Sequence, residues 1–215
     1  MPPVWFRRMG DIPGLDYEPP VPVDRTKLPN HAAVPEVHRY EFDGRIHESL
    51  SWEYMEDGEE VSTSASPAHG VAFSGSDDRE LATKTVLTRL WEGLELPGEP
   101  SDYHFAIQGA AGTLWSRRKS EPDVLEWFEH LNWLDLRLIQ AAPDAVRDEY
   151  AAAQPGRSEF YSVAAFSNLI NLYSREGFLQ EALVVAQLAE QFGQREHAAA
   201  ELHERLAALQ AEDGD

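Results

Sequence analysis

The sequence predicts a mainly α-helical protein with an extended, proline-rich N-terminal arm and a small β-hairpin. Three observations support this fold class. Prolines are concentrated in the first 36 residues, apolar and charged residues alternate between 37 and 55, and apolar residues recur at helical spacing from 79 onward. We therefore expect a helical bundle or a repeat-like helical body to form the main part of the chain.

The composition is that of a folded protein and bears on its function. The chain has 215 residues, of which 42% are hydrophobic, so it has enough apolar side chains for a core. Its formal net charge of −20 disfavours binding to nucleic acids, because their phosphates are also negative. The absence of cysteine excludes disulfides and thiolate chemistry. Since no long apolar run or signal peptide is visible, we expect a cytoplasmic protein without a membrane partner, and the abundant arginine and alanine suggest a bacterial one.

The arm, residues 1–36, contains eight of the 14 prolines. Proline fixes φ and has no backbone N–H, so we expect this segment to be extended and non-helical. Its apolar side chains could anchor it: Val4, Trp5, Phe6, Leu15 and Tyr17. The arm could lie along its own protein, dock on a partner or a second subunit to form a homo-oligomer, or remain loose.

Residues 37–60 are expected to form the β-hairpin, because their aromatic and aliphatic side chains fall on even positions. Asp43-Gly44 marks the turn. A two-residue turn would place Tyr40 opposite His47 and mix the two faces. We therefore predict a three-residue loop that pairs Tyr40 with Ile46 and keeps the apolar face together.

The same hairpin suggests one candidate for chemistry. His38 and Glu48 would lie across the two strands from each other and could form an acid–base couple. A pair of solvated polar side chains is the simpler interpretation.

Residues 61–78 are rich in serine and glycine and are expected to be a linker. Residues 79–215 are expected to form the helical domain. Asp77 and Glu80 are spaced as a helix start. Apolar periodicity then predicts helices at about 79–95 and 102–119, from 120–123 onward, briefly after Pro143, and at about 159–175, 179–192 and 195–210.

The most specific pattern lies at residues 163–196. It places a bulky residue, a helical apolar stripe, a turn glycine and two alanines seven residues apart in this order: Phe166, Leu169, Ile170, Tyr173, Gly177, Ala182 and Ala189. This order resembles the tetratricopeptide repeat, a helix–turn–helix unit of about 34 residues. Gln194 replaces the proline that often closes the unit, and no second copy is evident. An ordinary antiparallel helix pair with the same spacing is the alternative.

The resemblance implies that the first helix of this pair binds a protein or peptide. In the family, ligand contacts come from the concave side of that helix. The matching partner-binding candidates here are Asn168, Asn171, Ser174 and Arg175. Ser167 stands where members that bind a peptide carboxylate have a lysine, so the resemblance implies a generic polar groove.

Other candidate sites are weaker, and no catalytic, cofactor-binding or metal-binding residue is predicted. Glu126 with His130, and His197 with Glu201, could each share a helix face, but each pair provides only two metal ligands. The small residues at 109–112, followed by basic residues at 117–119, are interpreted as helix packing with a basic C-terminal turn.

These observations favour a non-enzymatic adaptor or assembly protein that binds another protein or a peptide. A second hypothesis is an acidic inhibitor or immunity-type protein that neutralises a basic partner by charge complementarity. A third is a small metal-dependent hydrolase that uses the scattered histidines and carboxylates.

Overall fold

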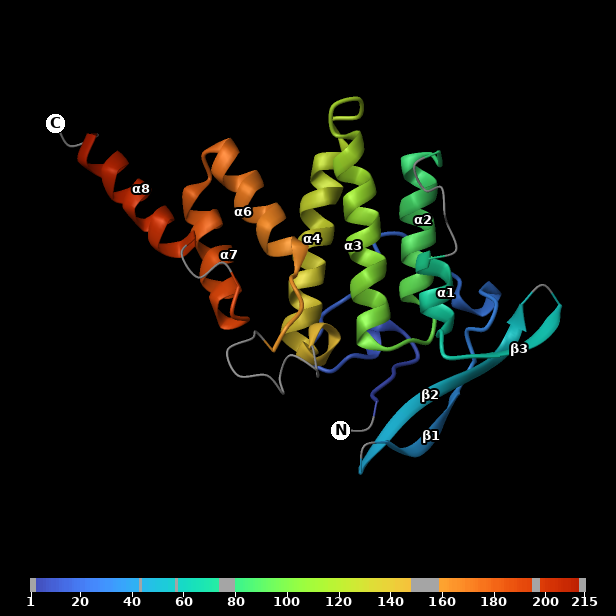
Figure 1. The fold of residues 1–215 in the computed structure, drawn as a ribbon. Helices are drawn as coiled ribbons and strands as arrows, with labels where there is room; N and C mark the ends of the chain where they lie inside the picture. Colours follow the sequence, from blue (N-terminus) through green and yellow to red (C-terminus); the bar gives the residue numbers. More distant parts are fainter. Residues whose placement is uncertain are drawn as a thin grey trace. The chain divides into compact units, whose positions relative to one another are not determined.

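The computed structural model describes residues 3–42, 44–56, 58–73, 80–147, 159–194 and 198–212. The chain divides into two units, Met1–Ala145 and Val146–Asp215 (Figure 1). Helices predominate among the described residues, and one small antiparallel sheet accompanies them, so the mainly α fold class is confirmed. The first unit contains the arm, the hairpin and the helices before residue 146, which were predicted as separate segments.

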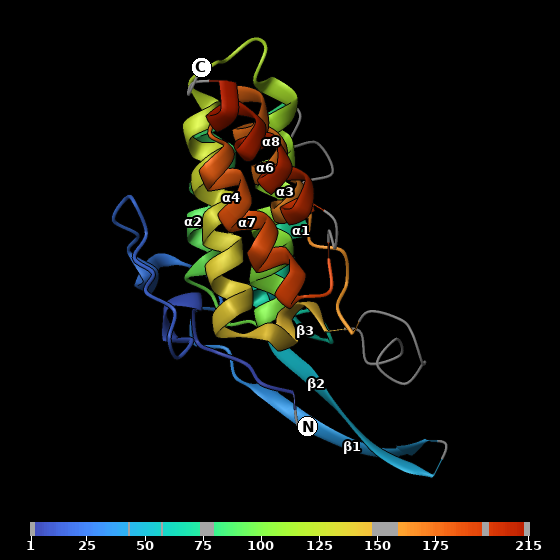
Figure 2. The same ribbon diagram turned by 90° about the vertical axis from the view of Figure 1, so that its left-hand side faces the viewer.

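The first unit begins with the arm and continues into the sheet and then the helices. Its arm contains two short 3₁₀ turns, Met9–Asp11 and Arg25–Lys27. The elements that follow are β1 (Pro35–Phe42), β2 (Arg45–Glu56), β3 (Glu59–Thr63), α1 (Pro67–Phe73), α2 (Thr83–Leu94), α3 (Pro100–Arg117) and α4 (Val124–Ala141). The strands pair in the order β1-β2-β3. Figure 2 shows the β1–β2 hairpin extending away from the helices of this unit.

The arm lies along its own unit. Met9, Ile12 and Leu15 are buried in the core. The backbone groups of Phe6 and Gly98 exchange two hydrogen bonds of 2.9 and 3.0 Å, which tie the arm to the segment between α2 and α3. The first of the three alternatives for the arm is therefore observed.

The predicted hairpin register is wrong. Tyr40 pairs with His47, and Phe42 pairs with Arg45 next to a two-residue turn. Gly44 has a φ of 69°, which suits the Asp-Gly turn of such hairpins. The prediction assumed that the apolar side chains of both strands share one buried face. At the end of the hairpin neither face is buried, since Phe42 and Ile46 are 65% and 78% exposed, so burial does not select the register there.

The segment predicted as a linker contains regular structure. It begins with the end of β3 and continues into α1. The Ser66 hydroxyl accepts a 3.0 Å hydrogen bond from the backbone N–H of His69, and Pro67 is the first helical residue. A serine cap followed by proline is a local helix-start signal. The linker prediction was therefore wrong for this part of the segment, because the serine and glycine content hides the helix-start signal.

Helices α2, α3 and α4 form at the predicted places, and their bounds differ by a few residues. Helix α2 begins at Thr83, after the expected start, and the proposed cap Asp77 lies outside the described residues. Helix α4 is apolar over much of its circumference, since Phe128, Leu131 and Leu136 are completely buried. It packs against α3.

The second unit contains α6 (Ala164–Glu176), α7 (Leu179–Gln191) and α8 (Ala198–Glu212). Another 3₁₀ turn, Pro143–Val146, spans the boundary between the units. Helix α7 packs against both α6 and α8. Gly177 ends α6 with a φ of 86°, a left-handed conformation that allows the chain to reverse.

The predicted helix pair is therefore confirmed, and the predicted small residues are buried in it. Ala182 and Ala189 on α7 are completely buried, as close packing of helices requires. The resemblance to a tetratricopeptide repeat stays a prediction, because an ordinary helix pair has the same features.

Gln194 closes the pair in place of the missing proline. Its side-chain amide donates a 2.7 Å hydrogen bond to the Tyr161 carbonyl and accepts a 2.9 Å bond from the Val163 N–H. One side chain thus links the end of α7 to the residues that enter α6.

We expect Ala182→Leu to destabilise the second unit by about 1–3 kcal/mol, because overpacking forces neighbouring side chains and backbone apart. Chemical denaturation followed by circular dichroism measures this change. Val184→Leu on the same helix is the matched control, since Val184 is 57% exposed and should tolerate the change. Equal stability of both variants would show that Ala182 is not at a close helix contact.

We expect Gly112→Ala to stabilise the first unit by about 0.5–1 kcal/mol. Gly112 lies inside α3, and a Cβ atom added there meets no heavy atom within 4 Å. Thermal unfolding of the variant measures the gain. Gly177→Ala is the opposite case, because its positive φ makes alanine strained, and it should lower the stability of the second unit.

Candidate protein-binding surfaces

The four predicted partner-binding residues all lie on α6. Asn171 and Arg175 are exposed and one turn apart, while Asn168 and Ser174 are half-buried. Phe166, Leu169 and Tyr173 are buried on the same helix. Two of the four candidates, Asn171 and Arg175, therefore reach solvent, and the role of all four in binding stays a prediction.

The hairpin provides a second candidate surface, because its apolar side chains are exposed. We define the hairpin surface as the exposed apolar side chains in the paired part of β1 and β2, residues 35–42 and 45–52, which are Val37, Tyr40, Phe42 and Ile46. Their exposed fractions are 50%, 52%, 65% and 78%. Exposed apolar side chains grouped on one element are more informative than scattered ones, because such groups mark interaction sites.

Both faces of the hairpin contribute to this surface. Since directly paired residues share a face, Tyr40 and Phe42 lie on the face that carries His47. The His47 ring stacks on Tyr40 at 5.5 Å between centroids and meets Phe42 edge-on at 6.1 Å. Val37 and Ile46 lie on the opposite face. Exposed apolar side chains therefore lie on both faces of the hairpin.

The sheet around these side chains is acidic. Its three strands contain seven glutamates and two arginines. A partner with basic side chains around an apolar centre would complement it, because opposite charges steer association and select the partner.

The proposed couple of His38 and Glu48 does not form. The register places His38 opposite Ser49 and Arg39 opposite Glu48, so the two side chains lie on opposite faces of the sheet. Glu48 instead accepts a 2.6 Å hydrogen bond from Arg39. The wrong register is the reason for this wrong prediction.

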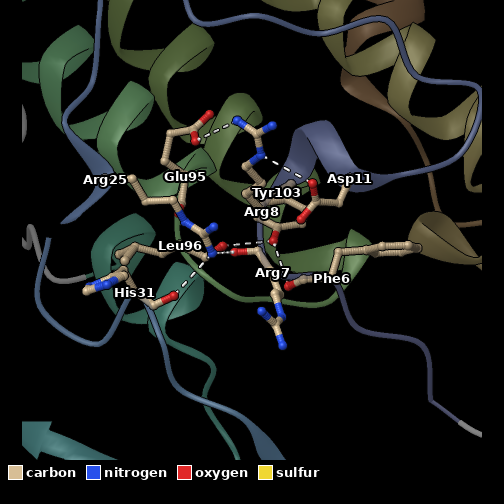
Figure 3. A network of polar contacts seen from close by, with 9 residues as sticks. All are labelled: Phe6, Arg7, Arg8, Asp11, Arg25, His31, Glu95, Leu96 and Tyr103. Carbon is tan, nitrogen blue, oxygen red and sulfur yellow. Dashed lines mark hydrogen bonds and ion pairs between the residues drawn. The ribbon is translucent and has the colours of Figure 1, made fainter.

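The arm is held against the segment after α2 by a network of polar contacts (Figure 3). The Arg25 guanidinium donates to the carbonyl oxygens of Glu95, Arg7 and His31 at 3.0, 2.7 and 3.1 Å. The Tyr103 hydroxyl donates to the carbonyl of Leu96 at 2.8 Å. These contacts join three separate segments, so they hold the arm in place.

A second polar cluster joins α1 to α3. Asp102 accepts hydrogen bonds from the Ser66 hydroxyl and from the Glu99 N–H, at 2.7 and 2.8 Å. Its other oxygen lies 3.1 Å from the His69 ring. In a serine-nucleophile triad the histidine would accept the serine proton, but here the hydroxyl is directed at the aspartate. The cluster therefore caps two helix starts and has the geometry of a structural network.

Glu99 lies beside this cluster and is half-buried. Burial, and to a lesser extent the Asp102 carboxylate, raises the pKa of Glu99 to about 7. The sequence gives no local signal for this shift, because it depends on the packing around the start of α3.

A buried contact between a histidine and a carboxyl group links α3 to α4. The His104 ring lies 2.6 Å from Asp135, and both side chains are almost completely buried. Burial raises the pKa of Asp135, and the hydrogen bond with His104 opposes that rise. Such a pair specifies how two helices face each other and is costly to break singly.

Of the two candidate metal pairs, only Glu126 with His130 lies wholly within the described residues. The ring of His130 lies against Trp91 and Trp127, at 6.2 and 5.9 Å between centroids, and burial lowers its pKa. His197, the other proposed ligand, lies outside the described residues. Among those described, no cluster of three or more histidines and carboxylates is suitable for a metal ion.

The glycines of α3 do not mark a close helix contact. A Cβ atom at Gly109 or Gly112 would meet no heavy atom within 4 Å, so the packing interpretation fails at these two positions. Arg117 instead donates to the Thr83 hydroxyl at 2.8 Å, and Arg118 lies 3.8 Å from the centroid of the Trp115 ring. Arg117 and Arg118 at the end of α3 therefore contact their own unit.

Compared with protein families, curated proteins and solved structures, the chain shows no significant match. Within the residues that the structure describes, no helix combines the length and apolar character needed to cross a membrane.

We expect Glu99→Gln to stabilise the protein at pH 8 by on the order of 1 kcal/mol, after allowance for the partial exposure of this side chain. An unfolded chain loses the Glu99 proton near pH 4.5, whereas the folded protein keeps it to about pH 7. Native stability therefore falls as the pH rises through this window. Glutamine has no proton to lose, so the advantage of the variant should grow between pH 5 and 8.

Denaturant titrations at several pH values measure this difference. Glu60→Gln removes an exposed carboxylate from β3 and is the matched control. A pH-independent difference between Glu99→Gln and the parent would contradict the raised pKa.

Proposed function

We propose that this protein is a non-enzymatic adaptor or assembly protein that binds another protein. The observation that carries the proposal is the hairpin surface, whose four apolar side chains are each at least half exposed. Covering such side chains on binding removes apolar area from water, which is the main driving force of protein association. Aromatic residues such as Tyr40 and Phe42 are typical centres of binding energy.

The hairpin is also well anchored at its base. Trp52 of β2 is completely buried and meets Trp5 of the arm edge-on at 5.7 Å between centroids. A surface supported by a packed base loses less conformational entropy when it binds a partner. This arrangement favours a preformed binding element.

The α6 residues provide a second candidate surface, in the other unit. Asn171 and Arg175 reach solvent from one helix and could bind a polar or acidic segment of a partner. Two surfaces of different chemistry in two units would suit an adaptor, which brings two proteins together.

The acidic inhibitor is the second candidate function. It is favoured by the seven glutamates of the sheet and by the net charge of −20. Its partner would be basic, and its association rate would fall steeply as salt increases. An adaptor that binds mainly through apolar contacts would show weak salt dependence.

The test starts from affinity purification out of native cells, with partners identified by mass spectrometry and affinities then measured by calorimetry. We expect the double variant Tyr40→Ser, Phe42→Ser to weaken binding of the identified partner by tenfold or more, since each lost aromatic contact removes about 1 kcal/mol or more. Asn171→Ala and Arg175→Ala test the α6 surface in the same way.

Val184→Ser is the matched control, because it removes an exposed apolar side chain from α7 in the other unit. Circular dichroism confirms that each variant is folded. If the hairpin variant and both α6 variants bind every partner as the parent does, the proposed binding function of these surfaces is wrong.

A further inference from the structure

Strand β1 forms an open edge of the sheet. It pairs with β2 on one side only, and its residues 36–42 are all exposed. Within the described part of the chain, no hydrogen bond joins the backbone of these residues to anything outside the sheet. A regular open edge is a template for another strand.

The direction of the free backbone groups follows from the turn. In a two-residue hairpin the flanking pair, here Phe42 and Arg45, exchanges hydrogen bonds. Residues at even positions of β1 therefore face β2, and Val37, Arg39 and Glu41 direct their N–H and C=O groups outward. The same pattern predicts that odd-numbered residues of β2 direct their backbone groups toward the β1 side. Met55 agrees with this, because the Asn30 side chain forms hydrogen bonds with both its N–H and its C=O.

Natural edge strands usually carry features that prevent pairing, such as bulges, lysines or inner prolines. The pairing of β1 with β2 is continuous over all eight residues, without a bulge. The strand has no lysine, and its one proline, Pro35, is its first residue. The free edge is therefore suited to accept a strand.

We propose that β1 pairs antiparallel with β1 of a second copy of this chain, about a two-fold axis at Tyr40. This register places Arg39 opposite Glu41 of the second copy, and Glu41 opposite Arg39. Both residues direct their backbone groups outward, so the same two pairs would exchange the hydrogen bonds. Charge and backbone geometry thus favour one register.

Neighbouring registers are worse for a physical reason. A shift of the pairing by two residues places Arg39 opposite itself or Glu41 opposite itself, and like charges in direct opposition destabilise a sheet. A shift of the pairing by one residue would place a residue whose backbone groups point outward opposite a residue whose backbone groups point toward β2. Such a register would therefore lose the hydrogen bonds.

The side chains on the aromatic face also match in this register. Tyr40 lies opposite Tyr40 of the second copy, and His38 lies opposite Phe42. A dimer would therefore join two copies of the Tyr40, Phe42 and His47 cluster into one face. This dimer goes beyond the proposed function, because it joins two copies of the same chain through β1, whereas the proposed function is the binding of a different protein.

The net charge of −20 on each copy opposes the dimer. Salt at about 0.15 M screens distant charges beyond about 8 Å, whereas the directly opposed pairs interact at closer range. One strand pair buries less area than the roughly 1,200 Å² of a stable interface. We therefore expect a weak dimer that forms in the range of tens to hundreds of micromolar.

Sedimentation velocity of the full chain, over a concentration series at physiological salt, tests the proposal. We expect a concentration-dependent dimer for the parent. Arg39→Glu and Glu41→Arg should each weaken it by about tenfold or more, because two attractive pairs become repulsive. The double variant, Arg39→Glu with Glu41→Arg, restores both pairs and should dimerise again.

A mixture of the two single variants is the sharpest measurement. Neither should dimerise alone, but together they should form a heterodimer, because the two carboxylates of one variant then face the two guanidinium groups of the other. Glu53→Arg is the matched control, since it reverses a charge on β2 away from the edge and should leave the dimer intact. Melting curves check that every variant is folded, which matters because Arg39 also pairs with Glu48.

A parent that stays monomeric to the highest concentration would overturn the proposal. So would a dimer that both single variants leave unchanged, or a mixture that forms no heterodimer. These outcomes leave the proposed function intact, because the partner-binding test changes Tyr40 and Phe42 and does not involve the charges of Arg39 and Glu41.

Discussion

The first unit depends on how the carbonyl groups of the arm are satisfied. A proline-rich segment cannot form a long helix or pair as a central strand, so some of its backbone oxygens need other donors. The Arg25 guanidinium provides them, since it bonds carbonyls of the arm and of the segment after α2. One side chain thereby joins two carbonyls of the arm to the carbonyl of Glu95.

The position of the hairpin follows from this anchoring. The arm brings Trp5 against Trp52 and Asn30 against Met55, so the base of β2 is held by packing and by hydrogen bonds. The other end of the hairpin projects away from the helices of its unit (Figure 2). The apolar residues at that end therefore have no partner surface within the described part of their own unit, and this fact motivates the binding proposal.

Polar clusters specify the arrangement of the helices in the same unit. Asp102 receives donors from Ser66 and Glu99, and Asp135 pairs with His104 between α3 and α4. Apolar packing alone tolerates small rotations and slips of helices, whereas a buried carboxylate is stable only where its partners meet it. The charges that remain outside give the sheet its acidic character, which bears on the choice of partner.

The sequence by itself determined the features that depend on local spacing. Apolar periodicity located α2, α4, α6 and α7 because a helix repeats every 3.6 residues, and Gly177 located the reversal between α6 and α7. Composition determined the acidic charge. The same spacing indicated that Asn171 and Arg175 would be exposed, since they lie off the apolar stripe of their helix.

Only the tertiary structure decided the features that join distant residues. The hairpin register could not be inferred from the alternation alone, because alternation orders the faces only where one face is buried, and the end of this hairpin is exposed on both. Ser66 meets Asp102 across 36 residues, and Arg25 meets Glu95 across 70. Such contacts leave no periodic trace in a sequence, since they arise from the path of the folded chain.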